Sequence, residues 1–72
     1  MKTWTVELFL VDGFIERVLP GTDAPARWSR GDRGLLIVEN LPAASEAEAR
    51  LKAQRVRIIA ANEGRSSGTE IA

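Results

Sequence analysis

Apolar and polar residues alternate over the first 19 positions of the chain, which predicts two β-strands, residues 3–11 and 14–19. Asp12 and Gly13 lie between them and are a strong hairpin signal, because a two-residue type I′ turn needs positive φ at both of its central positions. We therefore expect an antiparallel hairpin in the first part of the chain.

A two-residue turn also fixes which side chains share a face of the hairpin. The face expected to form the core carries Trp4, Val6, Leu8, Leu10, Ile15 and Leu19. Arg17 is the polar exception on that face, where its aliphatic stem can be buried while its charge reaches solvent. The other face carries Phe9, Val11, Phe14 and Val18 among polar residues, so we expect it to be covered or to bind a partner.

Residues 20–34 show no periodicity and contain three glycines and two prolines. A connection of about 15 residues is long for a compact domain, and such loops usually are functional, are disordered or conceal a secondary-structure element. One candidate element is a short helical turn in residues 23–29, capped by Asp23 and with Pro25 in its first turn. The apolar residues 35–39 then predict a third strand.

A helix over residues 46–63 has the clearest boundaries in the sequence. Ser45 and Glu48 form a capping box at its start, and Gly64 is suited to end it. Residues 55–59 include β-branched residues that alternate as in a strand, so a shorter helix followed by a fourth strand is the alternative. We favour a single helix because no helix breaker lies between Ser45 and Gly64.

The apolar residues of this helix fall on two nearly opposite faces. One face carries Ala47, Leu51 and Ile58, and the other carries Ala49, Ala53, Val56 and Ala60. Either face can cover the sheet, and the remaining one is then exposed to solvent or to another chain. The pattern leaves this choice open.

Together these elements predict an α+β fold: a three-stranded antiparallel sheet, made of a β-hairpin, a long loop and a third strand, with one C-terminal helix packed on it. A chain of 72 residues forms one domain at most. We place that domain at residues 1–64 and expect residues 65–72 to be a polar, flexible tail.

The charge balance argues against a dedicated nucleic-acid-binding domain, which is usually basic. Lysine plus arginine and aspartate plus glutamate each number 10, so the formal net charge is +0. The chain has no cysteine, which fits a reducing compartment. Its apolar blocks are too short to cross a bilayer. We therefore expect a cytoplasmic protein that does not contact membranes.

The chain also lacks histidine and tyrosine. The commonest general base, the thiol nucleophile and the best nitrogen and sulfur metal ligands are thus missing. No serine has a base at a recognisable spacing, and no glycine-rich segment matches a phosphate-binding loop. We expect a protein that is not an enzyme, with no catalytic residue, no metal site and no cofactor.

Residues 26–34, with the sequence ARWSRGDRG, combine a tryptophan with three arginines. Trp28 either folds back onto a thin core or is exposed among arginines, a composition typical of protein-interface hot spots. We expect a small accessory or regulatory protein, of the kind found in phages and mobile elements, that binds a protein partner or forms a dimer. The candidate partner-binding residues are Phe9, Phe14, Arg27, Trp28, Arg30, Arg33, Arg50 and Arg57.

The alternative function is a nucleic-acid-binding regulator that contacts phosphates through the arginines of the loop and the helix. These arginines are Arg27, Arg30, Arg33, Arg50, Arg55 and Arg57. Asp23 and Asp32 in the same loop, and the absence of a net positive field, argue against it. The two functions differ in salt dependence, which is steep only for a nucleic-acid binder.

Overall fold

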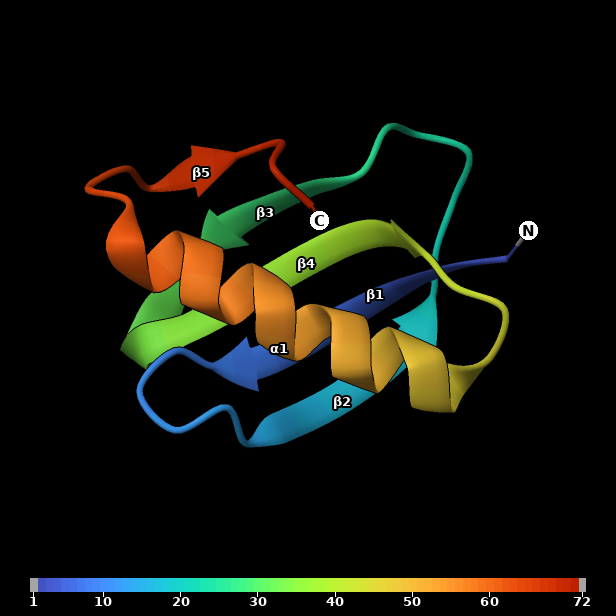
Figure 1. The fold of residues 1–72 in the computed structure, drawn as a ribbon, viewed down its shortest axis with the longest axis horizontal. Coiled ribbons are helices and arrows are strands. Elements are labelled where there is room, and N and C mark those ends of the chain that lie inside the picture. Colours follow the sequence, from blue (N-terminus) through green and yellow to red (C-terminus); the bar gives the residue numbers. More distant parts are fainter. Residues whose placement is uncertain (1, 72) are drawn as a thin grey trace.

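The computed structural model describes residues 2–71, which form one antiparallel five-stranded sheet with a single helix packed across one face (Figure 1). The elements are β1 (Thr3–Phe9), β2 (Ile15–Pro20), β3 (Arg27–Arg30), the 3₁₀ turn η1 (Asp32–Gly34), β4 (Leu35–Pro42), α1 (Glu46–Asn62) and β5 (Ser67–Gly68). The strand order is β2-β1-β4-β3-β5. The α+β prediction is confirmed, whereas the prediction of three strands is wrong.

The two unexpected strands lie at one edge of the sheet. β3 forms inside the segment expected to be a loop and pairs with β4, so that Trp28 lies opposite Val38. β5 forms in the segment expected to be a flexible tail and pairs with β3, with Gly68 opposite Trp28. Four and two residues are too few to produce a recognisable alternation, so neither strand was visible as a pattern.

The register of the β1–β2 hairpin differs by one residue from the expected one. Val6 pairs with Val18 rather than Leu19, and an irregularity follows Glu7. The turn is longer than two residues: the Phe9 N–H donates to the Phe14 carbonyl at 2.9 Å. The cause is the conformation of the turn, in which Gly13 has a positive φ and Asp12 does not, so it is not type I′.

The shifted register changes the two faces of the hairpin. Val18 packs against the core, while Leu19 is 39% exposed on the other side of the sheet. Arg17, expected as a polar exception in the core, instead pairs with Glu7 on the outer face at 3.0 Å. A one-residue slip moves side chains to the opposite face, as for Arg17, Val18 and Leu19. Beyond the irregularity the shift is two residues, so Ile15 still packs against the core as expected.

The core lies between the sheet and α1. Its largest fully buried side chains are Trp28, Leu8, Leu36, Leu41, Val6, Val38 and Val56. The helix contributes its small-residue face, Ala49, Ala53, Val56 and Ala60. The choice left open by the helical pattern is thereby settled: large side chains from the sheet fill the core, and alanines let the helix approach them closely. Leu51 and Ile58, on the other helix face, are exposed.

The helix prediction is confirmed, including residues 55–59, which are helical. The Ser45 hydroxyl accepts a hydrogen bond from the Glu48 N–H at 3.2 Å. The Glu48 carboxylate accepts one from the Ala44 N–H at 2.6 Å, one residue earlier than in a capping box. No helix in residues 2–71 is long and apolar enough to cross a membrane.

The segment before β3 is ordered by a side chain of β4. Asn40 is buried at a bulge, with φ at 58°, and its Oδ1 accepts hydrogen bonds from the backbone N–H and the hydroxyl of Thr22. Its Nδ2 donates to the Pro25 carbonyl. Residues 23–26 are therefore held as an irregular turn, and the predicted helical turn in residues 23–29 is wrong.

Candidate binding site

A hollow of about 520 Å³ opens at the end of the molecule where α1 finishes. The β1–β2 turn, the end of β3, η1 and the last turns of α1 form its walls. Its lining residues are Phe9, Leu10, Val11, Arg30, Arg33, Gly34, Arg57 and Ala61. We call it the arginine hollow, because three arginines from three different elements line it and none of its lining residues is acidic.

Arg57 holds the helix against the β1–β2 turn. Its Nη1 donates to the Leu10 carbonyl at 3.2 Å, and its Nε donates to Gln54 Oε1 at 3.1 Å. Gln54 in turn donates to the Gly13 carbonyl at 2.7 Å. A Cβ at Gly13 would collide with both side chains. The turn favours glycine because φ at Gly13 is 77°, and the two hydrogen bonds of Arg57 hold it at this wall of the hollow.

Arg33 is the least constrained of the three. It lies in η1 with φ at 59° and ψ at 31°, the left-handed region that residues other than glycine rarely occupy. It makes no side-chain hydrogen bond and no ion pair with any residue in the described range 2–71. Its five guanidinium N–H groups are free for another acceptor.

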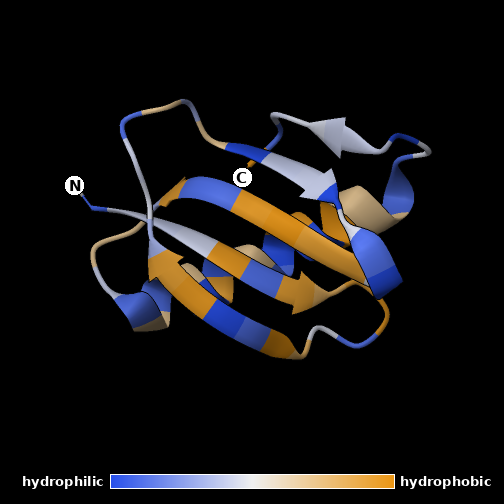
Figure 2. Cartoon of the chain, turned by 180° about the vertical axis from the view of Figure 1, so that it is seen from behind, coloured by the Kyte–Doolittle hydropathy of each residue, from blue (hydrophilic) through white to orange (hydrophobic). Residues whose placement is uncertain are grey.

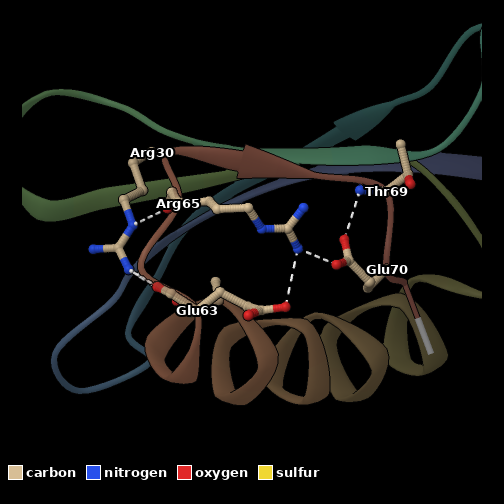
Figure 3. Close-up of polar contacts among 6 residues, drawn as sticks. Arg30, Glu63, Arg65, Thr69 and Glu70 are labelled. Atoms are coloured by element: carbon tan, nitrogen blue, oxygen red, sulfur yellow. Dashed lines mark hydrogen bonds and ion pairs between the residues drawn. The ribbon is translucent and has the colours of Figure 1, made fainter.

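Arg30 has a structural task at the edge of the same hollow. Its Nη2 donates to the carbonyls of Ala60 and Glu63 at 2.8 and 3.1 Å, and its Nε donates to the Arg65 carbonyl at 3.0 Å (Figure 3). Of these acceptors, Ala60 lies in the last turn of α1, where its carbonyl also accepts the Glu63 N–H at 3.3 Å, and Glu63 and Arg65 follow the helix. Arg30 thus ends α1 in place of the predicted left-handed glycine, since Gly64 has no positive φ.

The C-terminal segment is fixed by a second arginine. The Arg65 guanidinium lies between the carboxylates of Glu63 and Glu70, and Glu70 also accepts from the Thr69 N–H (Figure 3). Hydrogen bonds to Glu70 and then to Glu63 raise the pKa of Arg65. A hydrogen bond from its own backbone N–H, and then that from Arg65, lower the pKa of Glu70.

Trp28, the most prominent candidate in the sequence, is fully buried and offers no surface to a partner. Its ring lies under the C-terminal segment, with Arg65 Cζ 5.9 Å from the ring centroid. Its indole Nε1 has no hydrogen-bond acceptor within residues 2–71. The interpretation of Trp28 as a core residue is the correct one, and its exposure among arginines is not observed.

The structure brings together five of the eight candidate residues at the arginine hollow. Arg30, Arg33, Arg57 and Phe9 line it, and Phe14 lies against Phe9 with ring centroids 6.4 Å apart. The other three lie elsewhere: Trp28 in the core, Arg27 at the opposite end of β3, and Arg50 near the start of α1, where it pairs with Glu46 at 2.9 Å.

Exposed apolar side chains extend the hollow across the β1–β2 turn. Val11 is 88% exposed and Phe14 is 65% exposed. The sequence placed Val11 on the hairpin face expected to bind a partner, but Val11 was not among the candidate site residues. The available signal was its position beside Asp12-Gly13, since an apolar residue next to a turn is readily left in solvent. Leu10, Gly34 and Ala61 carried no signal, because they line the hollow only through the tertiary fold.

A second hollow, of about 690 Å³, lies at the opposite end of the hairpin. Its polar groups are already paired: the Thr3 hydroxyl donates to the Thr22 carbonyl at 3.0 Å, and Trp4 Nε1 donates to the Ala43 carbonyl at 3.0 Å. It is lined by one lysine and one aspartate, Lys2 and Asp23, so their charges offset each other. The arginine hollow is the better candidate because its charge is of one sign.

The sheet face opposite α1 carries no helix (Figure 2). Register places Glu7 there between Arg17 and Ile37, and Arg27 beside Glu39. Apolar and charged residues are thus mixed across this face, which offers neither a continuous apolar patch nor charge of one sign.

Three arginines in one hollow without a lining carboxylate are suited to binding an anion. Within residues 2–71 no group of three or more acidic, histidine or cysteine residues is placed to hold a metal ion. Comparison with known proteins gives no further guidance, since no family model, no curated protein and no solved structure matches this chain.

Proposed function

We propose that this chain is a small non-enzymatic interaction protein that binds a partner protein at the arginine hollow. The observation that carries the proposal is the meeting of Arg30, Arg33 and Arg57 in one hollow lined by no carboxylate. Beside them, Val11 and Phe14 expose apolar surface. Arginine next to aromatic and aliphatic side chains is the composition enriched at the energetic centres of protein interfaces.

The positions of the other arginines favour a protein partner over a nucleic acid. Arg50 lies ten residues of helix before Ala60, a distance of about 15 Å. Its charge is already paired with Glu46. Arg27 is three residues from Arg30 along β3, about 10 Å away, and lies opposite Glu39. The three arginines of the hollow therefore form one local cluster. Arg27 and Arg50 do not extend this cluster into the continuous track that follows a phosphate backbone.

The proposal places the protein in the cytoplasm and assigns it no catalytic step. The chain has no histidine, cysteine or tyrosine, and the hydroxyl of Ser45 is used to cap α1. An accessory protein whose only activity is binding, to another protein or to a second copy, is consistent with these features.

The test is affinity capture with matched baits. The wild-type chain, a hollow variant carrying Arg33→Gln and Val11→Ser, and a control carrying Arg55→Gln are immobilised and exposed to nuclease-treated extract of the source cells. Arg55 is an exposed helix residue that does not line the hollow. A protein retained by wild type and control but lost from the hollow variant supports the proposal. Equal retention on all three baits contradicts it.

Sedimentation across a wide concentration range tests self-association. A dimer of the wild type that dissociates in the hollow variant identifies a second copy as the partner. A dimer that persists in the hollow variant places the contact on another surface and argues against the arginine hollow.

A further inference from the structure

We infer that the arginine hollow recognises a short acidic segment of the partner, in which two neighbouring carboxylates lie next to an apolar side chain. This inference rests on the proposed function and specifies the chemistry of the partner.

The charge of the hollow is positive although the chain is neutral. Five cation–carboxylate contacts within residues 2–71 involve Arg17, Arg50, Lys52 and Arg65, and none involves an arginine of the hollow. The helix C-terminus contributes roughly half a negative charge, and Arg30 is directly bonded to it. Three guanidinium charges less this half leave about 2.5 positive charges among the lining residues, which two carboxylates would largely balance.

The hydrogen-bond donors that remain free are suited to carboxylates. Arg33 uses none of its donors within residues 2–71, and Arg57 uses Nε and Nη1 but not Nη2. A guanidinium presents its N–H groups as a planar fork, which matches the two oxygens of a carboxylate. Arg57 is further positioned by its bonds to the turn, so part of the ordering cost of binding is already met.

The apolar residues that line the hollow are the reason to expect an apolar side chain in the partner segment. Leu10, Val11 and Ala61 line the hollow together with the arginines, and Val11 is 88% exposed. Burying this surface requires an aliphatic group on the ligand, since a free anion would leave it in contact with water.

The acids near the hollow restrict the size of the anion. Asp12 and Asp32 are exposed and adjoin the lining residues Val11 and Arg33 in the chain. A long polyanion such as single-stranded nucleic acid would pass close to these carboxylates, and like charges repel. A segment with only two acidic residues avoids them.

The experiment is a titration of the ¹⁵N-labelled full chain followed by NMR. The probes are the capped peptide acetyl-Leu-Asp-Glu-Leu-amide, its neutral analogue acetyl-Leu-Asn-Gln-Leu-amide, inorganic phosphate and a ten-nucleotide oligo-dT. We expect saturable shifts from the acidic peptide, confined to the backbone of residues 9–11, 33–34 and 57–61 and to the guanidinium Nε–H signals of Arg33 and Arg57. The neutral analogue and phosphate are expected to give none.

Two variants and one control locate the contact. Arg33→Gln is expected to weaken binding of the acidic peptide, raising its Kd about tenfold, the usual effect of losing a hydrogen bond to a charged group. Because Arg33 has no side-chain hydrogen bond or ion pair within residues 2–71, this variant should keep the fold. Val11→Ser should also weaken binding of the acidic peptide, because it removes exposed apolar surface of the hollow. Arg55→Gln should bind as the wild type does.

Other results overturn the inference. Absence of saturable shifts, equal shifts with the neutral analogue, or saturation by phosphate alone each excludes recognition of an acidic segment. Tighter binding of oligo-dT, with shifts that extend to Arg27, Arg50 and Arg55, favours the nucleic-acid alternative. If the hollow variant loses its captured protein but the acidic peptide does not bind, the proposed function stands and this inference fails. If the peptide binds but capture is unaffected, the proposed function fails instead.

Discussion

Arg30 Nη2 lies 2.8 Å from the carbonyl oxygen of Ala60, so a side chain of β3 ends the last turn of α1. Carbonyls at a helix C-terminus have no partner within the helix, and a cation there is also favoured by the helix dipole. This contact joins a four-residue strand to the helix across the core. It makes the end of α1 dependent on an element that the sequence did not reveal.

Replacing Arg30 by glutamine should therefore loosen the end of the helix. We expect a loss of about 1–3 kcal/mol in the free energy of unfolding, because hydrogen bonds to a charged group are lost at several carbonyls. Urea denaturation measures the loss, and hydrogen exchange should show faster exchange in residues 60–66.

Arg27→Gln is the matched control for Arg30→Gln, since Arg27 lies on the same strand and makes no side-chain hydrogen bond or ion pair within residues 2–71. Its substitution should change stability by less than about 0.5 kcal/mol. If both substitutions lowered the free energy of unfolding equally, the hydrogen bonds of Arg30 to the end of α1 would not be what stabilises the helix.

How much of the fold the sequence reveals depends on the length of each element. Residues 46–62 offer four to five turns of helix with a cap, and residues 3–9 offer a regular alternation, so both were predicted. β3 and β5 contain four and two residues. β3 forms because it pairs with the edge of β4. β5 forms because it pairs with β3 and covers Trp28. Both depend on contacts between segments that are far apart in the sequence, which no local pattern shows.

Gly68 is required where β5 crosses the indole of Trp28. A Cβ at Gly68 would lie 2.7 and 2.8 Å from two ring carbons of Trp28, and that ring is fully buried. Gly68→Ala should therefore displace β5 and cost about 1–3 kcal/mol, the usual range for overpacking. Urea denaturation measures the loss, and tryptophan emission should shift to longer wavelength as the indole becomes exposed.

Gly64→Ala provides the comparison for Gly68→Ala. A Cβ at Gly64 meets nothing within 4 Å, and its φ is not positive. This substitution should leave stability unchanged or raise it by about 0.4–1 kcal/mol, because alanine restricts the unfolded chain. If Gly68→Ala is as well tolerated as Gly64→Ala, the close packing of β5 on Trp28 is wrong.

The pH dependence of the C-terminal segment follows from Glu70. Its hydrogen bonds lower its pKa below the ordinary value of 4.5, so the folded state favours the ionised form. The stability it contributes is present above the pKa of the unfolded chain and is lost as the pH falls through the lower folded pKa. Glu70→Gln should remove this part of the acid sensitivity.

The prediction for Glu70 is checked by NMR titration of its side chain and by denaturation of wild type and Glu70→Gln across the acidic range. The two proteins should differ in stability at neutral pH and converge in acid. A Glu70 pKa at or above 4.5, or a constant difference between the two stabilities, would refute it.

The candidate site was only partly predictable because, as for β3 and β5, tertiary contacts bring its residues together. Arg33 and Arg57 are separated by 24 positions, and their meeting requires both the turn at η1 and the anchoring of α1 to the Leu10 carbonyl. The arginine-rich stretch drew attention to Arg30 and Arg33, but Trp28 shares that stretch and is buried. Arg30 lies two residues after Trp28 and therefore shares its face of β3, but it is exposed because it ends the strand.

The face that α1 presents to the sheet gives the last prediction. Ala53 is fully buried against the sheet, and Ala47 is exposed on the other face of the same helix. Ala53→Leu adds volume where the helix is closest to the strands and should cost about 1–3 kcal/mol. Ala47→Leu should stay within about 0.5 kcal/mol of the wild type, because leucine is a good helix former and solvent accommodates it. Urea denaturation of both variants distinguishes the faces. The opposite ranking would mean that Leu51 and Ile58, not the alanines, face the core.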